Sequence, residues 1–494
     1  MTRQTIRFRR QGREIEVAGF HPRTTFLDYL RLQERSLGTK EGCAEGDCGA
    51  CTIALGRVRD GRLSYEPVNA CILLLGQVDG AEIVTVDDLA TQGGLHPVQA
   101  ALVAHHGSQC GFCTPGIVMS LFTLYHEGAR PVARQAVNDA LAGNLCRCTG
   151  YRPIMDAALA VCAAEPRDAF TADKAIRALH VEAMATDRRD VFVGGAKRFF
   201  AAPASEEALA ALYTENPDAT LVAGCTDVGL WVTKGMAELD RVIWLGRIPE
   251  LARIAADGQA LSLGATVTHA QAHAALAAID PDLGEIMRRF GSAQVRATGT
   301  VGGSIANGSP IGDIAPALIA LGASLELRHA GDTRSIPLEA FFLAYRRQDR
   351  APGEFVRRLV VPLLRPDEVF RAYKVSKRLD EDISAVLGAF RLSLEGRRVA
   401  SARIGFGGMA GIPKRAEATE AALSGALLDE PLSWEPALDA IGRDFQPLDD
   451  HRASAAYRSI VARNLLQKAL REVASGETRT TRLTGHRDTL AAAE

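Results

Sequence analysis

The sequence predicts an α+β protein built from several domains, and three observations support this. The chain has 494 residues, far more than one typical domain holds. Its first 91 residues show the alternating pattern of short strands, whereas residues 92–164 show the 3.6-residue period of helices. From Val191 onward, strand-like segments, helical segments and glycine-rich loops alternate.

The first domain, residues 1–91, is predicted to be a compact β-rich unit with one helix. A hairpin is expected where an alternating segment turns at Gln11 and Gly12. Thr25 is placed to cap the helix that follows. A glycine-rich loop with three cysteines comes next, and two more strands are expected at residues 52–58 and 62–68.

The second domain, residues 92–164, is predicted to be a small helical bundle. Pro115 and Pro153 occupy first-turn positions, where the missing proline N–H has no helical partner to lose. Residues 165–190 are charged and weakly periodic, so we expect a linker with little structure of its own. The expected helices cover residues 96–106, 115–128, 133–144 and 153–164.

The remainder is predicted to form two further domains and a tail. Residues 191–367 alternate strands, helices and glycine-rich loops. Residues 368–475 form an α+β domain that ends in a helix over residues 454–474. Residues 476–494 are polar and are expected to fray.

Composition and charge exclude several classes of protein. The net charge of -2 indicates no strongly basic face for nucleic acid. No apolar run is long enough to span a membrane. The first residues lack the apolar core of a secretory signal, so the cysteines are expected to stay reduced and the location to be cytoplasmic.

Eight cysteines in the first third of the chain form two quartets with the spacing of iron–sulfur sites. In the first quartet, C-x4-C-x2-C precedes a distant fourth cysteine, which is the plant-type ferredoxin arrangement for a [2Fe–2S] cluster. Glycines within the loop allow the sharp turns that three converging thiolates require. The alternative, a zinc ribbon, favours paired C-x2-C knuckles. The members are Cys43, Cys48, Cys51 and Cys71.

The second quartet combines C-x2-C with C-x-C at expected helix ends. Zinc would also accept four thiolates. The neighbouring ferredoxin-type motif favours iron, because a second redox centre extends an electron path. The members are Cys110, Cys113, Cys146 and Cys148.

Long segments of the chain resemble the xanthine oxidase family of molybdenum hydroxylases. KEGCAEGDCGACT, VNAC, GSQCGFCTPG and GNLCRCTGYRPI are similar to its two-cluster region. LVAGCTDVGLWVTK, VRATGTVGGSIANGSPIGDIAPAL, YKVSKRLDEDISAV and GFGGMAGIPKRAE are similar to its flavin region. The resemblance runs from about Ile6 to Ser475 and is greatest to the small subunit of bacterial members, which carries both clusters and FAD on one chain.

The resemblance implies a fold and cofactors. The expected domains are a β-grasp ferredoxin-like domain, a helical-bundle [2Fe–2S] domain, a two-part α+β FAD-binding domain of PCMH type at residues 191–367, and a C-terminal α+β flavoprotein domain at residues 368–475. The cluster held by the Cys43 quartet is expected nearer the flavin. The cluster held by the Cys110 quartet is expected nearer the molybdenum.

Two loops of small residues are the expected FAD contacts. No G-x-G-x-x-G follows a first strand, so a Rossmann site is not indicated. The loops instead offer glycines, at which backbone amides can approach a diphosphate, and hydroxyl donors. The resemblance adds Phe290, Asp313 and Ser384. The loop residues are Leu221, Val222, Ala223, Gly224, Cys225, Thr226, Asp227 and Val228, followed by Thr300, Val301, Gly302, Gly303 and Ser304.

Contacts to NAD are also implied by the resemblance. It places Asp227 near the nicotinamide and Tyr373 at an aromatic position there. Mammalian members have a lysine near the flavin. Lys374 and Lys414 lie nearby in this sequence, but the resemblance assigns neither to that role.

No segment resembles the large molybdopterin domain of the family. The resemblance therefore implies a separate molybdopterin-binding large subunit that holds the molybdenum cofactor, in a heterotetramer with two copies of each subunit. Xanthine or hypoxanthine would be oxidised in the partner, and electrons would pass through two clusters to FAD and then to NAD. The alternatives are an equivalent subunit of an enzyme for aldehydes or N-heterocycles and, from another class, an iron–sulfur redox sensor or scaffold. The intact flavin loops argue against the sensor.

Overall fold

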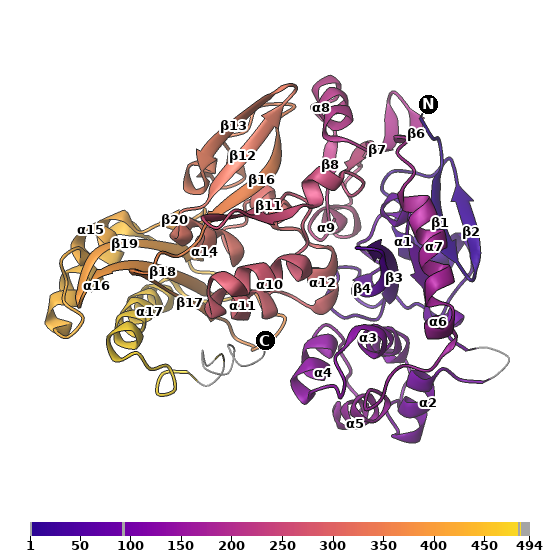
Figure 1. Ribbon diagram of the computed structural model, residues 1–494, viewed down its shortest axis with the longest axis horizontal. Helices are drawn as coiled ribbons and strands as arrows, with labels where there is room; N and C mark the ends of the chain where they lie inside the picture. The colour runs from indigo at the N-terminus through magenta and orange to yellow at the C-terminus, as the bar shows by residue number, and fades with distance from the viewer. Residues whose placement is uncertain (1, 91–93, 483–484, 486–494) are drawn as a thin grey trace. The chain divides into compact units, whose positions relative to one another are not determined.

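The computed structural model describes residues 2–90, 94–482 and 485 (Figure 1). The chain divides into two compact units. The first contains residues up to Pro249 together with Gly291–Gly299, and the second contains Glu250–Phe290 and the residues from Thr300 onward. The region 191–367, expected to be one domain, thus contributes to both units.

The first unit begins with a five-stranded sheet of order β2-β1-β5-β3-β4, in which β1 and β5 run parallel. The predicted hairpin is confirmed, with both Gln11 and Gly12 in the left-handed region at its turn. Thr25 caps α1, because its Oγ1 accepts from the Asp28 N–H at 3.0 Å. The elements are β1 (Ile6–Arg10), β2 (Arg13–Val17), α1 (Phe26–Asp28), the π-helical turn η1 (Tyr29–Gln33), β3 (Thr52–Arg59), β4 (Arg62–Asn69), the 3-10 turn η2 (Leu75–Val78), β5 (Glu82–Val84) and the 3-10 turn η3 (Val86–Asp88).

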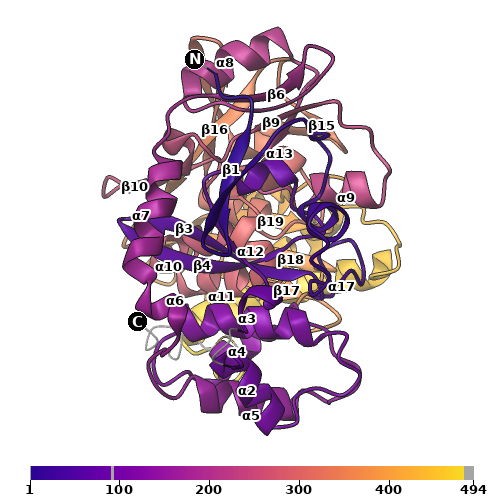
Figure 2. The same cartoon turned by 90° about the vertical axis from the view of Figure 1, so that its right-hand side faces the viewer.

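Four helices follow and lie together beside this sheet (Figure 2). They confirm the helical segments expected from the 3.6-residue period. The longest, α3, packs against β3, β4 and α4, which accounts for its burial on most sides. Pro115 and Pro153 lie in first turns as predicted. The helices are α2 (Pro97–Ala104), α3 (Thr114–Glu127), α4 (Arg134–Leu141) and α5 (Arg152–Val161).

The segment 165–190, expected to have little structure, instead contains two helices. These are α6 (Ala169–Ala172) and α7 (Lys174–Ala185). Phe170, Val181 and Met184 are buried in the same core as the helical bundle, and α7 packs on β1, β3 and β4. A few well-spaced apolar side chains are enough to dock a short helix against an existing sheet, although they give only a weak period in the sequence.

A second sheet completes the first unit, with strand order β6-β7-β9-β8. β7, β9 and β8 run parallel to one another, and β6 is antiparallel to β7. Helix α12 (Ala293–Thr298) returns to this unit from later in the chain. The other elements are β6 (Val191–Gly195), β7 (Arg198–Ala202), α8 (Glu206–Glu215), β8 (Thr220–Val222), α9 (Val228–Thr233) and β9 (Arg241–Trp244).

The second unit contains a five-stranded antiparallel sheet of order β10-β11-β16-β12-β13. Helix α14 is buried along its whole length, in keeping with its sequence IAPALIAL. The elements are the 3-10 turn η4 (Pro249–Ala252), β10 (Ile254–Ala256), β11 (Ala260–Gly264), α10 (His269–Ile279), α11 (Pro281–Arg288), α13 (Val301–Asn307), α14 (Ile314–Leu321), β12 (Ser324–His329), β13 (Asp332–Pro337), the 3-10 turn η5 (Leu338–Phe341), β14 (Phe342–Ala344), β15 (Arg347–Gln348) and β16 (Phe355–Pro362).

An antiparallel sheet of order β17-β18-β19-β20 and its helices end the second unit. This confirms the expected α+β segment with a long final helix. The elements are β17 (Glu368–Val375), β18 (Val386–Glu395), β19 (Arg398–Gly407), β20 (Lys414–Arg415), α15 (Glu417–Leu423), the 3-10 turn η6 (Pro431–Trp434), α16 (Glu435–Asp444) and α17 (Ala455–Ser475).

The start of the tail is anchored rather than frayed. The Arg482 guanidinium lies 2.6 Å from the Glu472 carboxylate on α17 and 2.8 Å from the Asp282 carboxylate on α11. Both carboxylates are fully buried. Two buried anions need a cation, and the tail supplies one. The expectation of fraying is wrong up to Arg482, and residues 483–484 and 486–494 lie outside the described residues.

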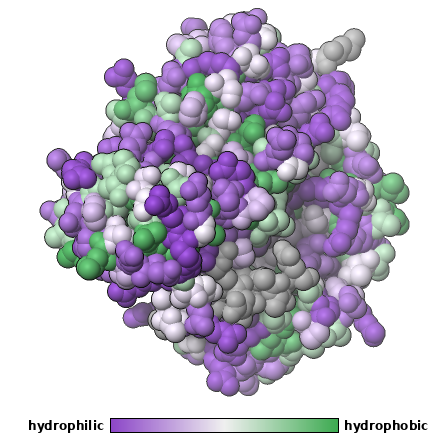
Figure 3. Space-filling model, turned by 60° about the vertical axis from the view of Figure 1, so that its left-hand side comes forward, coloured by the Kyte–Doolittle hydropathy of each residue, from purple (hydrophilic) through white to green (hydrophobic). Residues whose placement is uncertain are grey.

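The surface of the described residues is mixed in character. On the face drawn in Figure 3, hydrophilic residues predominate and hydrophobic ones occur in small groups. Within the described ranges, no helix combines the length and the apolar character needed to cross a bilayer.

We predict that Arg482→Met destabilises the second unit, because it removes the cation that the buried carboxylates of Asp282 and Glu472 share, and leaves Glu472 with its longer contacts to Arg371 and Lys468. Breaking such a pair costs about 3–5 kcal/mol. The midpoint of thermal unfolding should fall by several degrees, whereas it should hold in the control Arg471→Met, since Arg471 is exposed on α17. Equal midpoints for the two variants would contradict the anchoring role.

Candidate functional site

The first cysteine quartet is gathered by the loop between η1 and β3. The N–H groups of Glu45 and Cys48 both donate to Cys43 Sγ at 3.4 Å. Hydrogen bonds from the Cys48 and Cys71 thiols hold the pKa of Cys43 far below its usual value. The thiol of Cys51 in turn lies within hydrogen-bonding reach of Cys71. Four sulfurs thus converge at one point, where the neighbouring thiols, and to a smaller extent two backbone amides, stabilise the thiolate form of Cys43.

The loop reaches this shape through glycine. Gly46 and Gly49 have φ values of +80° and +68°, which other residues rarely adopt. A Cβ on Gly42 would lie 2.8 Å from Cys48 Sγ. At the end of α9, Lys234 Nζ donates to the Cys43 carbonyl at 2.5 Å, so a cation lies beside this quartet.

The second quartet joins the N-terminal ends of α3 and α5. Its thiols meet in pairs, Cys110 with Cys148 and Cys113 with Cys146. Burial, assisted by Cys146, raises the pKa of Cys113 to about 12. Cys110 and Cys148 are exposed, so this site opens at the surface. Phe112, Leu145 and Tyr151, which neighbour these cysteines in sequence, are 50%, 46% and 41% exposed.

The two quartets are connected by direct contact of their loops. The Leu145 N–H donates to the Cys48 carbonyl at 3.0 Å. Asn144 Nδ2 donates to the Gly49 carbonyl at 3.2 Å. A Cβ at Gly116 would overlap the Gly49 carbonyl. The spacing of the cysteines predicted each quartet separately but not this contact between them.

The first of the two small-residue loops, residues 221–228, packs against the ferredoxin-like part. A Cβ on Gly229, just after the loop, would lie 2.6 Å from the Ile72 carbonyl, and Ile72 follows the ligand candidate Cys71. The Ala223 carbonyl accepts from Gln77 Nε2 at 3.1 Å. Cys225 has a φ of +69°, and burial raises its pKa to about 12.

Asp227 is exposed at the N-terminal end of α9. Its side chain makes no capping hydrogen bond to the helix. The structure thus shows no local capping role for this carboxylate, although burial raises the pKa of the Asp227 carboxyl above its usual value.

The second loop, residues 300–304, opens helix α13. Thr300 Oγ1 caps the helix by accepting from the Gly303 N–H at 2.9 Å. Ser304 Oγ lies 2.9 Å from Nε2 of His269, whose ring contacts Phe290 at a centroid distance of 4.1 Å. The Gly303 N–H is engaged by this helix cap because Thr300 lies three residues before it, and a contact between the Gly303 backbone and a diphosphate stays a prediction.

Asp313 and Ser384, expected FAD contacts, form a buried group with a lysine. Ser384 Oγ donates to Asp313 Oδ1 at 2.5 Å. Lys374 Nζ lies 2.6 Å from Asp313 Oδ2 and donates to the Arg289 carbonyl at 3.2 Å. The structure thus brings Lys374, which the sequence left unassigned, to this site. Its position in β17 carries no distinguishing pattern.

Tyr373, the neighbour of Lys374 in β17, is buried in the core of the C-terminal domain. Its hydroxyl donates to Glu472 Oε2 at 2.9 Å. The structure thus engages this hydroxyl within the protein, and a contact between Tyr373 and NAD stays a prediction.

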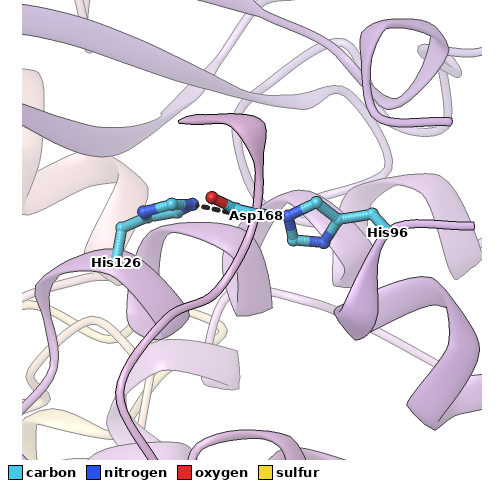
Figure 4. A group of neighbouring side chains, drawn as sticks. All are labelled: His96, His126 and Asp168. Carbon is cyan, nitrogen blue, oxygen red and sulfur yellow. Dashed lines mark hydrogen bonds and ion pairs between the residues drawn. The ribbon is translucent and has the colours of Figure 1, made fainter. Parts of the chain in front are cut away.

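A histidine pair meets the carboxylate of Asp168 in the first unit (Figure 4). His96 Nε2 lies 2.6 Å and His126 Nε2 3.0 Å from the same oxygen, Asp168 Oδ2. His96 Nδ1 accepts from the Val98 N–H at 3.2 Å, so the neutral ring carries its proton on Nε2 and donates it to Asp168. With its proton on Nε2, His96 is a donor to Asp168 and not a metal ligand, so we interpret the group as a structural link between α2, α3 and α6, with a hydrogen bond from His96 and a close polar contact from His126.

Electrostatics support this interpretation. Burial alone would raise the pKa of Asp168, but hydrogen bonds from His126 and His96 lower it well below the usual range. The carboxylate therefore stabilises the fold at neutral pH, and the effect is lost in acid as the pH falls through the lowered pKa.

We predict that Asp168→Ala lowers the midpoint of thermal unfolding at pH 7, because it leaves the His96 N–H buried without its acceptor. An unsatisfied buried donor costs about 1–3 kcal/mol. Asp173→Ala is the matched control, since Asp173 is exposed and its side chain makes no capping bond. Stoichiometric zinc in the wild type that disappears in Asp168→Ala would instead reveal a metal site.

Three family descriptions match the chain. Residues 85–159 match a [2Fe-2S] binding domain, which includes the second quartet. Residues 195–364 match the FAD binding domain in molybdopterin dehydrogenase. Residues 371–473 match the CO dehydrogenase flavoprotein C-terminal domain.

Curated relatives include xanthine dehydrogenases. The chain is 30% identical to that of Emericella nidulans over 89% of its own length and 36% of the relative. It is 31% identical to the xanthine dehydrogenase/oxidase of Mus musculus over 83% and 35% of the two chains. The chain therefore spans about a third of the length of the curated relatives it matches.

Solved structures share the fold of part of the chain. A Cu,Mo-CO dehydrogenase chain in a cyanide-inactivated form aligns with a TM-score of 0.53 and 25% identity, over 57% of this chain and 99% of that one. A chain of quinoline 2-oxidoreductase from Pseudomonas putida 86 aligns with a TM-score of 0.52 and 24% identity, over 57% and 98%.

Proposed function

Because the chain belongs to the molybdenum hydroxylase family, we propose that it is the electron-transfer subunit of such an enzyme and carries two [2Fe–2S] clusters and FAD. One observation carries this proposal: two convergent cysteine quartets touch through their loops on a chain that also has the family's FAD-binding domain. When bound, the clusters pass single electrons, and FAD collects two and releases them as a hydride.

The chain's own residues supply the cluster ligands and the N–H groups that surround them. Cys43, Cys48, Cys51 and Cys71 are proposed to hold the cluster nearer the flavin. In support, Gly229, which follows residues 221–228, packs against Ile72, next to Cys71. The N–H groups that donate to Cys43 Sγ stabilise negative charge on the sulfur, which is how the surrounding protein tunes an iron–sulfur centre.

Cys110, Cys113, Cys146 and Cys148 are proposed to hold the cluster nearer the electron source. In support, two of these thiols are exposed and have exposed apolar neighbours at Phe112, Leu145 and Tyr151. Exposed aromatic and aliphatic groups beside a redox site suit a docking partner. We propose that the partner is a molybdopterin-binding large subunit, in a complex with two copies of each chain.

FAD is proposed to contact the two small-residue loops and the group around Asp313. Lys374 and Ser384 fix the orientation of the Asp313 carboxylate, and Lys374 also holds the backbone of Arg289 next to Phe290. These contacts order the residues before the cofactor binds.

The proposed overall reaction is the oxidation of xanthine or hypoxanthine by the partner, with NAD as the final acceptor. The names of the curated relatives support xanthine as substrate. An aldehyde or N-heterocycle is the second candidate, and the name of quinoline 2-oxidoreductase, a solved structure that shares the fold, supports an N-heterocycle. A sensor or scaffold is disfavoured by the match to an FAD-binding domain.

Copurification of the partner tests substrate and acceptor together. The complex should reduce NAD with xanthine faster than with aldehydes or quinoline. Turnover of quinoline or an aldehyde without any turnover of xanthine would shift the assignment to the second candidate.

We predict that the isolated chain contains about four iron atoms, from two [2Fe–2S] centres. Cys113→Ser should remove about half of the iron and one of two EPR signals of the reduced protein, because serine is a poor ligand for this iron. Cys162→Ser is the control. Cys162 is buried in the core and belongs to neither quartet. A content of about two iron atoms and one zinc would show that the second quartet binds zinc.

We predict that Asp227→Ala weakens NAD reduction while electron transfer to an artificial dye survives. Asp227 is an exposed residue and its side chain makes no capping bond to α9, so its replacement should leave the flavin loop folded. Flavin content, read from the visible absorbance, should stay constant. Equal loss in both assays, together with loss of flavin, would show a structural role for Asp227 instead.

A further inference from the structure

Gln294 lies in a helix that belongs to the flavin-binding region by sequence and to the cluster-binding unit by structure. It sits in α12, whose segment Gly291–Gly299 groups with the cysteine loops rather than with the residues before and after it. Helix α12 packs on β4 and α4. The Gln294 side chain is fully buried there.

The amide nitrogen of Gln294 faces three oxygen atoms. Its distances are 3.1 Å to Thr52 Oγ1, 3.1 Å to Asn144 Oδ1 and 3.2 Å to Ser120 Oγ. Thr52 and Ser120 come from β3 and α3, and Asn144 lies just before Cys146. One side chain therefore ties together the β-rich domain, the helical bundle and the loop of the second quartet.

These oxygens can only accept from Gln294. The Thr52 hydroxyl already donates to the Gly49 carbonyl at 2.7 Å, and the Ser120 hydroxyl already donates to Asn144 Oδ1 at 2.7 Å. A donor is therefore required at this point, and the amide orientation follows from the network.

This arrangement leaves a buried oxygen without a hydrogen-bond partner. Gln294 Oε1 has none among the described residues. A buried unsatisfied carbonyl costs free energy, so an apolar side chain of similar length would be the cheaper choice for packing alone. We infer that an amide is favoured at this position because its nitrogen donates to the oxygens of Thr52, Ser120 and Asn144.

The network holds the contact between the two quartets. Asn144 Nδ2 donates to the Gly49 carbonyl, and the next residue, Leu145, donates its N–H to the Cys48 carbonyl. Cys48 belongs to the first quartet, and Cys146, which follows Leu145, belongs to the second. One hydrogen bond and a short run of covalent bonds thus connect a ligand candidate of each site.

We propose that Gln294 is a positioning residue that fixes the separation of the two cluster sites by clamping Thr52, Ser120 and Asn144. The inference rests on the proposed function, since it requires both quartets to hold [2Fe–2S] clusters. The step it serves moves one electron from the site of the second quartet to that of the first, so one site is oxidised and the other reduced, and no bond is made or broken.

The test compares Gln294→Met with the wild-type full chain. Methionine keeps the length and apolar volume but cannot donate, so the Asn144 loop should loosen and the two quartets should shift relative to each other, while each quartet keeps its four cysteines together. Thr298→Ala is the control, because it removes a hydrogen bond to the Gln294 carbonyl within the same helix without touching the network. Both variants should keep the wild-type iron and sulfide content.

The measurement is EPR of protein fully reduced with dithionite, in which both clusters are paramagnetic. Their magnetic coupling falls steeply with distance, so Gln294→Met should show a reduced or lost splitting, and Thr298→Ala should keep it. Unchanged splitting in Gln294→Met, with only a lower unfolding midpoint, would overturn the proposal and leave a stabilising role.

A second variant covers the case in which Gln294→Met loses a cluster. Gln294→Asn keeps the donor but shortens it by one methylene, so it should load both clusters and show an altered splitting. If it instead keeps the wild-type splitting, the proposal fails. A wild-type chain without two reduced-cluster signals would contradict the proposed function rather than the role of Gln294.

Discussion

The carbonyl of Cys48 accepts a hydrogen bond from the backbone N–H of Leu145, and the chain around this bond is packed too closely for ordinary side chains. At Gly49 and Gly116, an added Cβ would overlap backbone atoms of the neighbouring loop. Close approach of two backbones is possible only where side chains are absent. The mutual placement of the two cysteine quartets depends on this contact.

The close contact between the two cysteine loops also accounts for the return of a later segment, Gly291–Gly299, to the first unit. Loops with few side chains cannot bury much apolar surface, so their contact needs polar support from outside. Helix α12 supplies it through Gln294, and α7 covers the nearby sheet with Val181 and Met184. The electron-carrying part of the molecule is therefore assembled from residues that lie far apart in the sequence.

In the second unit, buried ion pairs hold together segments that lie far apart in the sequence. Asp313 is paired with Lys374, and Asp282 and Glu472 share Arg482. In each case an ion taken out of water requires a partner in good geometry. These pairs connect β17, α11, α14 and the start of the tail, so the proposed flavin contact at Asp313 is held by residues outside its own loop.

Sequence by itself determined features that depend on neighbours in the chain. The spacing of the cysteines, the turn at Gln11 and Gly12, the cap at Thr25 and the helical periods all follow from local geometry, and the structure contains them. The resemblance to the family added the α+β domains, which the comparisons confirm. The expected looseness of residues 165–190 and of the tail up to Arg482 was wrong, because docking against a distant surface leaves little periodic signal.

Only the tertiary structure decided how distant polar groups pair. Gln294 with Asn144, Lys374 with Asp313 and the histidine pair with Asp168 are separated by 150, 61 and up to 72 residues. A glutamine or a lysine has the same local propensity whether it faces water or a buried partner. Its role is fixed by which surface folding brings against it, and one sequence read locally does not contain that information.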